Sequence, residues 1–459
     1  MAPKWRLSVL GTLARLTCLV GLVAARFQVP YVYHNFRDMT ELLVNVTNYR
    51  PDLVTLYSIG KSIEGRDLWV AMLTSQATED QLLKPNIRYI GNMHGNEVVG
   101  KEMLLHLIAY MVNTYDTDPQ MQWFLDNTIV HIMPTMNPDG MERSQHGSCI
   151  GVVGRNNAAD FDLNRNFPIV VGTGRSQKEQ PETTAVTRWM NVVPFVLSAN
   201  LHGGALLVRF PFDNGVEYTS NPAPDDDVFH HLARTYAGNH PVMHQGVGCE
   251  RDGRTFKEGI VNGANWYPFA GSMADYSYVQ GGSLELTLEI SCCKHPPQHT
   301  LRQFWAENIR PLIRLMEETH RGVKGIISDD QGGAIGGARM VIKERQQVAF
   351  HTSPRGEFWR ILLPGSYTLL VSADGYQTTE TPFTIVEGHS AVLNITLKAL
   401  HHPSNYLIGD GEKLAGSATG QHDFASFYEP MPAASAPKAT TSWAGRLLSL
   451  LSSGRRSSS

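Results

Sequence analysis

The sequence predicts an α/β domain with a mainly parallel sheet, followed by a small β-sandwich. From about Phe27 to His320, short strand-like apolar runs alternate with longer helix-like runs, a pattern typical of α/β layer folds. After Gly322 the chain changes to short β-branched runs separated by turn residues. From Leu400 onward it is rich in Ser, Ala, Pro and Gly without periodicity, which predicts a flexible tail. The predicted boundaries are 26–321, 322–399 and 400–459.

The elements of the first domain follow from hydrophobic periodicity. Predicted strands are Arg88–Gly91, Ile129–Met133, Phe195–Leu201 and Leu284–Ile290. Predicted helices are Asp38–Asn48, Val98–Tyr115, Glu182–Met190, Asp226–Ala237 and Leu301–Glu318. Because strands and helices alternate along the chain, the strands are expected to lie parallel, joined by crossover helices.

The second domain is predicted from seven short runs in some eighty residues. Turn residues such as Gly332-Gly333 and Pro364-Gly365 separate them. This density of short strands favours a β-sandwich. The runs are 323–327, 339–343, 347–351, 357–362, 366–373, 380–386 and 391–398.

Composition narrows the class of protein. The 459 residues suggest two or three domains, and the net charge of −4 without a basic stripe excludes a nucleic-acid partner. No apolar run is long enough to predict a membrane-spanning helix. Lys4 and Arg6, the apolar Leu16–Val23 and the small residues up to Ala25 predict a secretory signal over 1–25 and an extracellular protein.

Cysteines and sequons fit secretion. Cys18 would leave with the signal, and an even number of cysteines remains, which suggests two disulfides. The adjacent pair cannot easily bridge to itself, so two connectivities stay open. The remaining cysteines are Cys149, Cys249, Cys292 and Cys293. Glycosylation is predicted at Asn45 and Asn394, each in an Asn-x-Thr sequon.

Three residues form a candidate metal site. His94 and Glu97 follow the strand-like run 86–91, and His202 follows the run 195–201. Side chains at the carboxyl ends of strands meet at one edge of an open α/β sheet. Two His and one Glu, with a fourth position left for water, are typical of a catalytic rather than a structural zinc site.

Further residues could complete such a site. Arg155 and Arg165 are ten residues apart, the second beside Asn164, and arginine forks match carboxylates in bidentate fashion. On the run 283–289, Glu285 and Glu289 share one face of an apolar strand, where unpaired acids are costly unless they are functional. The residues alone leave both as candidates for a catalytic base.

Five segments together resemble the regulatory (N/E) branch of the zinc metallocarboxypeptidases. They are Gly91–Glu97, Met136–Gly140, Asp162–Pro168, Ser198–Gly204 and Glu289–Lys294. The resemblance covers about residues 27–398 and keeps the order and spacing of the motifs. It implies a three-layer α/β/α catalytic domain followed by a transthyretin-like β-sandwich.

The resemblance also implies roles for individual residues. His94, Glu97 and His202 match the ligands of one Zn²⁺, and Glu289 matches the general base. Arg155 matches the arginine that polarises the scissile carbonyl. Asn164, Arg165 and Tyr267 match the groups that bind the terminal carboxylate of the substrate. Asp213 matches the acid that receives a basic side chain, so the implied reaction releases C-terminal Arg or Lys from peptides and proteins.

Further expectations follow from the same resemblance. The bridge Cys249–Cys292 is implied, which leaves Cys149 with Cys293. The branch usually has Met-Gln-Asp where this chain has Met273-Ala274-Asp275, a departure that bears on the Arg-versus-Lys preference. The run Leu447–Leu451 is too short and too polar for a lipid-anchor signal, so a secreted form is favoured, with a lipid-anchored cell-surface form as the alternative. The protein is expected to be a monomer.

Two other classes of function compete with an enzyme. A non-catalytic binding homologue would lack metal-binding or base residues, whereas all of them are present here. A partner-binding role for the β-sandwich has no chemical motif to support it. Zinc content together with turnover of a peptide ending in Arg would separate the three hypotheses.

Overall fold

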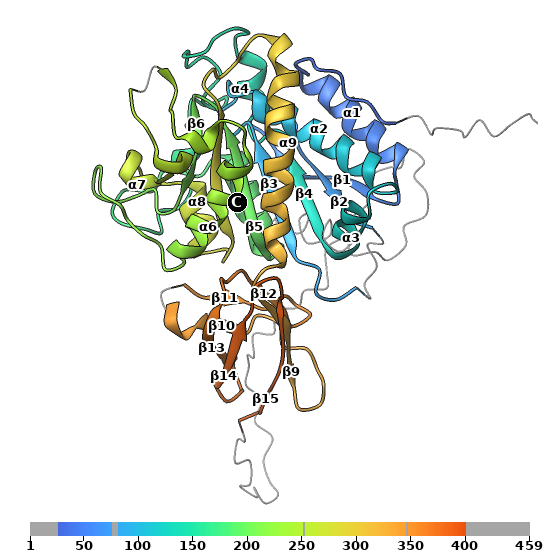
Figure 1. Cartoon of the computed structure of the whole chain (residues 1–459), viewed down its shortest axis with the longest axis vertical. Helices are drawn as coiled ribbons and strands as arrows, with labels where there is room; N and C mark the ends of the chain where they lie inside the picture. Colours follow the sequence, from blue (N-terminus) through green and yellow to red (C-terminus); the bar gives the residue numbers. More distant parts are fainter. Residues whose placement is uncertain (1–25, 76–80, 251–252, 346–347, 401–459) are drawn as a thin grey trace, which may run out of the picture.

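A computed structural model describes residues 26–75, 81–250, 253–345 and 348–400. The predicted signal peptide and almost all of the predicted tail lie outside these residues. The chain forms a large α/β domain and a smaller β domain that packs against one end of it (Figure 1). Within the described residues, no helix is both long and apolar enough to cross a membrane.

The large domain is built on a mixed sheet of eight strands in the order β1-β2-β4-β3-β5-β8-β6-β7. The four central strands, β4, β3, β5 and β8, run parallel to one another. Antiparallel pairing appears between β1, β2 and β4 and between β8 and β6. The predicted parallel sheet is therefore confirmed at its centre. The strands are β1 Val54–Lys61, β2 Asp67–Leu73, β3 Asn86–Gly91, β4 Ile129–Met133, β5 Phe195–His202, β6 Ala205–Phe210, β7 Ile260–Asn262 and β8 Leu284–Ser291.

Helices cover both faces of this sheet. Apolar side chains of α1, α2, α3, α6 and α9 pack with Tyr89 and Leu73 in one core, whereas α5 packs with Ile90 and Met72 in a second. Neighbouring residues on a strand point to opposite faces, so the two cores are separate layers. On the first face α9 lies between α2 and α6 (Figure 1). The helices are α1 Phe36–Tyr49, α2 Val99–Thr114, α3 Pro119–Asn127, α4 Pro138–Arg143, α5 Pro181–Val192, α6 Asp226–Asn239, α7 Gly263–Trp266, α8 Met273–Val279 and α9 Leu301–Glu317.

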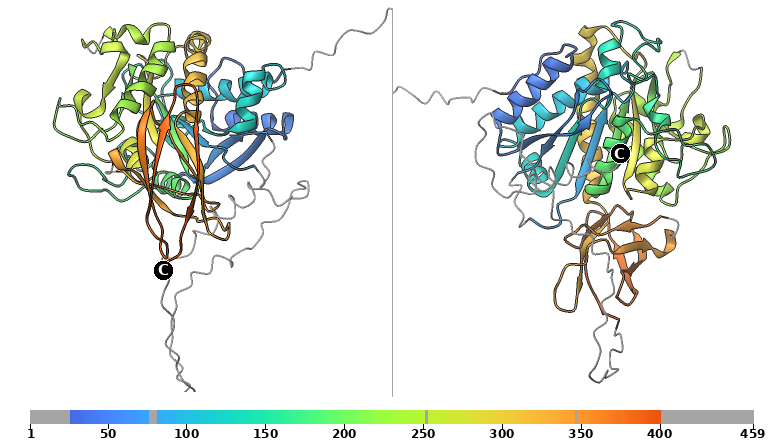
Figure 2. Two further views of the ribbon diagram at one scale, coloured as in Figure 1. Left: turned by 60° about the horizontal axis from the view of Figure 1, so that its bottom comes forward. Right: turned by 180° about the vertical axis from the view of Figure 1, so that it is seen from behind.

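The small domain confirms the predicted β-sandwich. Within the described residues a three-stranded sheet, β12-β9-β15, faces a four-stranded sheet, β11-β10-β13-β14 (Figure 2). Each of the seven predicted runs overlaps one of these strands, and their apolar side chains form one core. The strands are β9 Val323–Asp329, β10 Arg339–Ile342, β11 Phe350–His351, β12 Glu357–Arg360, β13 Gly365–Ser372, β14 Thr379–Ile385 and β15 Ala391–Leu397.

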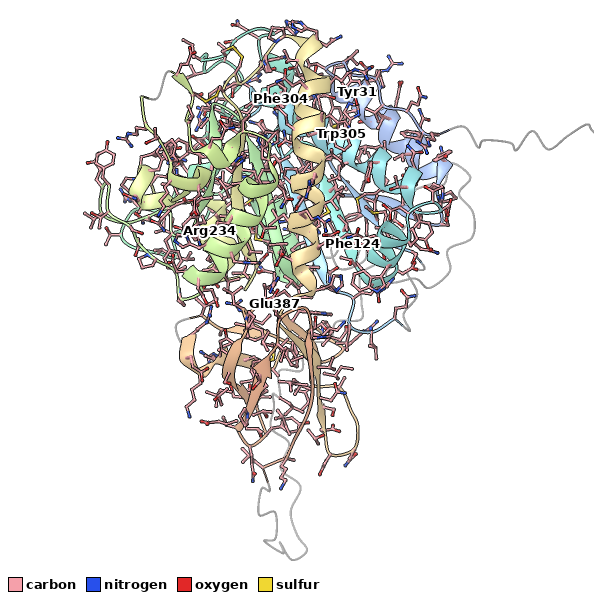
Figure 3. All side chains as sticks on the ribbon, in the orientation of Figure 1. Tyr31, Phe124, Arg234, Phe304, Trp305 and Glu387 are labelled. Carbon is pink, nitrogen blue, oxygen red and sulfur yellow. A yellow bond between two sulfur atoms is a disulfide. The ribbon has the colours of Figure 1, made fainter. Side chains whose placement is uncertain are left out.

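The small domain contacts the large one at the amino ends of the central strands. The backbone N–H of Leu83, before β3, donates to Glu357, and Arg360 donates to the carbonyl of Gly282, before β8. At the same junction Arg321 pairs with Glu387, which Figure 3 labels there. The carboxyl ends of the central strands, where His94, Glu97 and His202 were predicted to meet, lie at the opposite end of the sheet.

Candidate active site

The loop after β3 positions two of the predicted metal ligands. The side-chain amide of Asn92 donates to the carbonyls of His94, Gly95 and Glu97, at 3.0, 2.9 and 3.1 Å. Gly95 is required in this loop because a Cβ there would lie 2.3 Å from the backbone of Gly140. The buried Asn92 side chain thus holds the turn in the conformation that places His94 and Glu97 in the site.

The structure brings the three predicted ligands together. Nδ1 of His94 and Nδ1 of His202 lie 3.1 and 3.0 Å from Oε2 of Glu97, and the three donor atoms lie within 4.8 Å of one another. All three side chains are buried. Imidazole nitrogens with one carboxylate oxygen form a donor set that suits Zn²⁺. The residues present therefore fit a zinc ion.

Asp162 orients this cluster. Its Oδ1 lies 3.0 Å from Nε2 of His94, and its Oδ2 accepts a 2.9 Å hydrogen bond from Arg155. Burial would raise the pKa of Asp162, but His94 and Arg155 hold it far below its usual range. An Nε2–H that donates to Asp162 leaves the Nδ1 lone pair of His94 free for a metal. Asp162 belongs to the segment Asp162–Pro168, but the sequence alone indicated no role for it.

Glu97 is the acidic member of the three-residue ligand cluster. Its Oε1 accepts from Lys294 at 2.7 Å and from Arg155 at 3.2 Å. Burial would raise the pKa of Glu97, but the charges and hydrogen bonds of His94 and His202 hold it well below its ordinary value. Lys294 is a second residue whose place in the site was not foreseen.

The structure separates the two candidate bases. Glu289 pairs in register with His202 across β5 and β8 and lines the cavity beside the ligand cluster, and burial raises its pKa. Glu285 lies deeper and is only 1% exposed, with Arg88 at 2.5 Å and Ser277 at 2.6 Å. Only Glu289 is therefore placed to meet a substrate.

One cavity of about 190 Å³ gathers the candidate residues. Of the nine predicted metal, catalytic and substrate-binding residues, eight line it: His94, Glu97, Arg155, Asn164, Arg165, His202, Tyr267 and Glu289. Asn164 is fixed because its side-chain oxygen accepts from the backbone of Met273 at 3.0 Å. Arg165 lies over the ring of Phe269, 3.4 Å from its centroid. A cation held on an aromatic face beside an amide suits an anionic group.

The ninth residue, Asp213, is placed differently from the prediction. It is 1% exposed, and its carboxylate is already engaged by Arg209, at 2.5 Å, and by the hydroxyl of Ser272. Arg209 lines the cavity, and Asp213 is not among the lining residues. Ala274, which stands where the regulatory branch usually has Gln, is also buried and does not line the cavity. A ligand in the cavity meets the guanidinium before the carboxylate.

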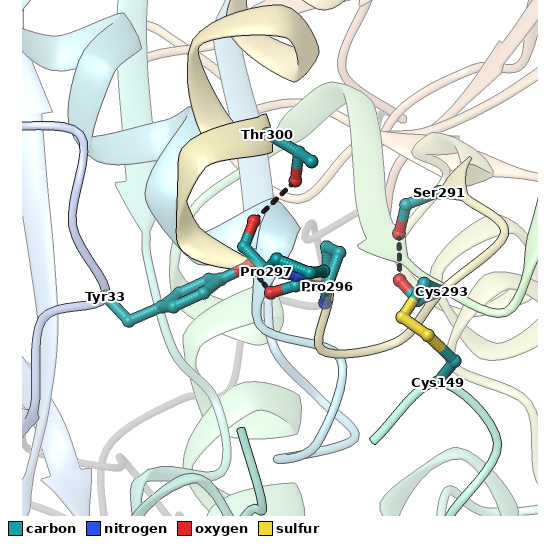
Figure 4. Close-up of a disulfide and its surroundings, with 7 residues drawn as sticks. All are labelled: Tyr33, Cys149, Ser291, Cys293, Pro296, Pro297 and Thr300. Atoms are coloured by element: carbon teal, nitrogen blue, oxygen red, sulfur yellow. Dashed lines mark hydrogen bonds between the residues drawn. A yellow bond between two sulfur atoms is a disulfide. The ribbon is translucent and has the colours of Figure 1, made fainter. Parts of the chain in front are cut away.

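Both predicted disulfides are present. Cys149 pairs with Cys293 and Cys249 with Cys292, so the tandem cysteines after Glu289 each bridge to a different loop. Near the first bridge, Ser291 donates to the carbonyl of Cys293 (Figure 4). The turn that leaves the cavity at Lys294 is therefore covalently anchored on two sides.

Comparisons with known proteins agree with this geometry. Residues 39–310 match the family model for zinc carboxypeptidases, and residues 322–398 match the carboxypeptidase regulatory-like domain. The chain is 42% identical to mouse carboxypeptidase M over 391 residues, which cover 84% of this chain and 87% of that protein. The segment Pro211–Gly215 and the pair Cys292-Cys293 also favour a likeness to carboxypeptidase M.

Two more matches extend the comparison. Human carboxypeptidase D is 40% identical over 397 residues, 85% of this chain but only 28% of that longer protein. Among solved structures, thrombin activatable fibrinolysis inhibitor matches with a TM-score of 0.52 at 19% identity, over 64% of this chain and 77% of that one, which shows the shared fold. The chain belongs to the zinc carboxypeptidase family and is a zinc metallocarboxypeptidase with a regulatory-like β domain.

Proposed function

We propose that the enzyme hydrolyses the last peptide bond of peptides and proteins and releases the C-terminal residue. The observation that carries this proposal is the single cavity in which a zinc-binding cluster lies beside Glu289, Arg155 and Arg165. A cavity wall that carries arginines selects a free carboxylate, which only the chain terminus or an acidic side chain supplies. Peptides with a free C-terminus therefore fit better than internal segments.

Each residue has a distinct part in the proposed reaction. When bound, Zn²⁺ would supply a Lewis acid that polarises the scissile carbonyl and makes water more acidic. Glu289 accepts a proton from the attacking water and hands it to the leaving amine. Arg155, already paired with Glu97 and Asp162, donates to the oxyanion that develops on the carbonyl oxygen. Asn164, Arg165 and Tyr267 hold the terminal carboxylate and fix the position of the scissile bond.

The first candidate for the released residue is Arg or Lys, as the resemblance implies through Asp213. The presence of the acid supports this candidate, but a basic side chain would have to displace Arg209, which is 2.5 Å from Asp213. Two like charges would then share one small cavity, which opposes binding. The geometry therefore favours the general exopeptidase activity over a specific release of Arg or Lys.

We further propose that the enzyme is secreted, glycosylated and monomeric. Two disulfides support an oxidising compartment. Asn45, on α1, and Asn394, on β15, are both exposed, as glycan acceptors must be. Expression with the native N-terminus tests this proposal, because the protein should accumulate in the medium and lose apparent mass on treatment with an N-glycosidase.

The proposed activity is tested with the purified protein and N-blocked peptides that differ only in the last residue. One zinc per chain, release of a single C-terminal residue, and loss of that release on chelation with recovery on zinc addition are expected. A folded, zinc-loaded protein that releases no residue from any peptide would instead be a non-catalytic homologue. Amidated versions of the same peptides serve as controls and should not be cleaved, because they offer no terminal carboxylate to Arg165.

A further inference from the structure

A buried arginine on β6 forms part of the cavity wall. Arg209 is 2% exposed and pairs in register with Thr287 on β8, two residues before Glu289. Its Nε donates to Asp213 at 2.5 Å and its Nη2 donates to the carbonyl of Tyr267 at 2.9 Å. No described residue accepts a hydrogen bond from Nη1. The side chain is thus fixed on one edge, while donors remain for a ligand in the cavity.

Arg209 and Arg165 lie close together in this cavity. The guanidinium carbon of Arg209 is 4.5 Å from the centroid of the Phe269 ring, and that of Arg165 is 3.4 Å from the same centroid. Arg209 also lies 4.4 Å from the centroid of Tyr267. Aromatic faces stabilise a cation after its water has been removed. Two guanidinium groups therefore lie beside the same aromatic ring. Arg165 is the one at the proposed site for the terminal carboxylate.

The charges that line the cavity are mostly positive. The cationic lining residues are Arg155, Arg165, Arg209 and Lys294, whereas the acidic ones are Glu97 and Glu289. Asp213 does not add a free negative charge, because Arg209 and Ser272 already bind it.

A second buried carboxyl, Asp275, lies behind this pair and accepts from the backbone N–H groups of Asp213 and Asn214. Burial and the charge of Asp213 raise the pKa of Asp275 well above its ordinary value. Neither acid lines the cavity. The wall presents a cation to an incoming side chain.

We infer that the enzyme prefers peptides that end in Glu or Asp, and that Arg209 binds the side-chain carboxylate of that residue. This inference rests on the proposed exopeptidase function and specifies its substrate class. The two carboxylates of a terminal Glu are joined by a short aliphatic chain, so one could bind Arg165 and the other Arg209. Arginine forks bind carboxylates with two parallel hydrogen bonds. A terminal Lys or Arg would instead meet Arg209 as a like charge.

Because Arg209 covers Asp213, mutation of Arg209 should reverse the preference for an acidic C-terminal residue. Arg209→Ser removes the cation and opens the cavity wall in front of Asp213, which keeps its hydrogen bond from Ser272 but has lost its ion partner. The variant should therefore lose activity on Glu-terminated peptides and gain it on Arg- and Lys-terminated peptides. Truncation of one partner of a buried charge pair typically changes affinity by about 30-fold or more. A double variant, Arg209→Ser/Asp213→Asn, removes both charges and should cleave Phe- and Leu-terminated peptides without preference for either charge.

The experiment measures kcat/KM of the zinc-loaded full-length enzyme on N-blocked peptides ending in Glu, Asp, Phe, Leu, Lys or Arg. Wild type should favour Glu or Asp over Lys and Arg by at least about tenfold, and Arg209→Ser should invert that order. Arg254→Ser is a matched control, because Arg254 donates to the neighbouring carbonyl of Trp266 but does not line the cavity. Its order of preference should be that of wild type.

Folding is checked separately. Bound zinc and turnover of the Phe-terminated peptide report an intact site in each variant, and the double variant avoids the unpaired Asp213 that could destabilise the single one. A wild-type enzyme that cleaves Lys- or Arg-terminated peptides as fast as Glu-terminated ones overturns the inference and leaves the exopeptidase proposal standing. Zinc-loaded wild type that cleaves no peptide in the series overturns the proposed function itself.

Discussion

Asp162 contacts a zinc ligand with one carboxylate oxygen and the neighbouring arginine with the other, at 3.0 Å from Nε2 of His94 and 2.9 Å from Arg155. Outer-shell carboxylates of this kind fix the ring orientation of a metal-binding His. Asp162→Asn should lower zinc affinity about 10- to 100-fold, measured by competition with a chelator. Asp160→Asn, two residues away and exposed, is the matched control. Equal zinc affinity in both variants would show that His94 needs no such support.

Glu289→Gln should separate turnover from zinc binding. The variant keeps its shape and its hydrogen-bonding capacity but cannot accept a proton, so kcat should fall by about 10³-fold while bound zinc is unchanged. Glu285→Gln should keep kcat but lose about 3–5 kcal/mol of unfolding free energy, because it leaves Arg88 buried without its ion partner. Steady-state kinetics, zinc content and urea unfolding of both variants check this. An inactive Glu285 variant beside an active Glu289 variant would reverse the assignment.

One buried carboxylate at the junction between the two domains pairs with two arginines. Asp225, before α6, is fully buried and pairs with Arg345 at 2.5 Å and with Arg360, both from the β domain. Asp225→Asn should lower the free energy of unfolding by about 3–5 kcal/mol, since two arginines lose a charged partner. Asp227→Asn removes an exposed contact to Arg345 and should cost about 1 kcal/mol or less. Chemical denaturation of both variants, with kcat unaffected in each, is the measurement.

Stability should fall in mild acid because of His131. Burial, followed by the charge of Arg88, lowers the pKa of His131 from 6.5 to about 3. The folded protein therefore keeps this ring neutral while the unfolded chain takes up a proton. The resulting stability is complete above about pH 6.5 and is lost as the pH falls toward 3. Between pH 7.5 and pH 5, His131 should account for a loss of about 2 kcal/mol in the free energy of unfolding.

His131→Gln should remove that share, so its unfolding free energy should change less with pH than that of wild type. His389→Gln, at an exposed position of the β domain, is the control and should keep the wild-type slope. Urea unfolding of the zinc-loaded proteins at both pH values gives the comparison. Identical slopes for wild type and His131→Gln would mean that His131 is already protonated in the folded protein.

Much of the fold could be predicted because the buried strands are continuous apolar runs. The central strands β3, β4, β5 and β8 are buried along nearly their whole length and stood out for that reason. The hairpin of β1 and β2 was missed, since its strands are only partly buried and pair locally through a turn. Neither strand is a continuous buried run, and neither alternates strictly between buried and open positions, so hydrophobic periodicity gave only a weak signal for them.

The part of the site that lies in recognisable sequence motifs could be predicted. His94, Glu97 and His202 meet as expected because they follow neighbouring strands of one sheet. Arg209 was not predicted, since an arginine in an apolar strand gives no sign of its partner until the strand is placed. Its pairing with Asp213 across four residues depends on the bend after β6, which no local pattern encodes. The side-chain preference of the enzyme therefore could not be derived from motifs alone.

The tandem cysteines Cys292 and Cys293 link the order of the catalytic cavity to the oxidation state of the chain. One bridge ties residues 144 positions apart and the other ties residues 43 positions apart, and both end directly after the strand that carries Glu289. No cysteine of either bridge belongs to the apolar core that the sheet shares with α1, α2, α3, α6 and α9. A chain in which these four cysteines are still free thiols would thus collapse before the loops around its catalytic cavity are locked. Oxidation would then act as a late maturation step, and peptides in a reducing compartment would meet an enzyme whose scaffold is complete but whose cavity rim is still loose.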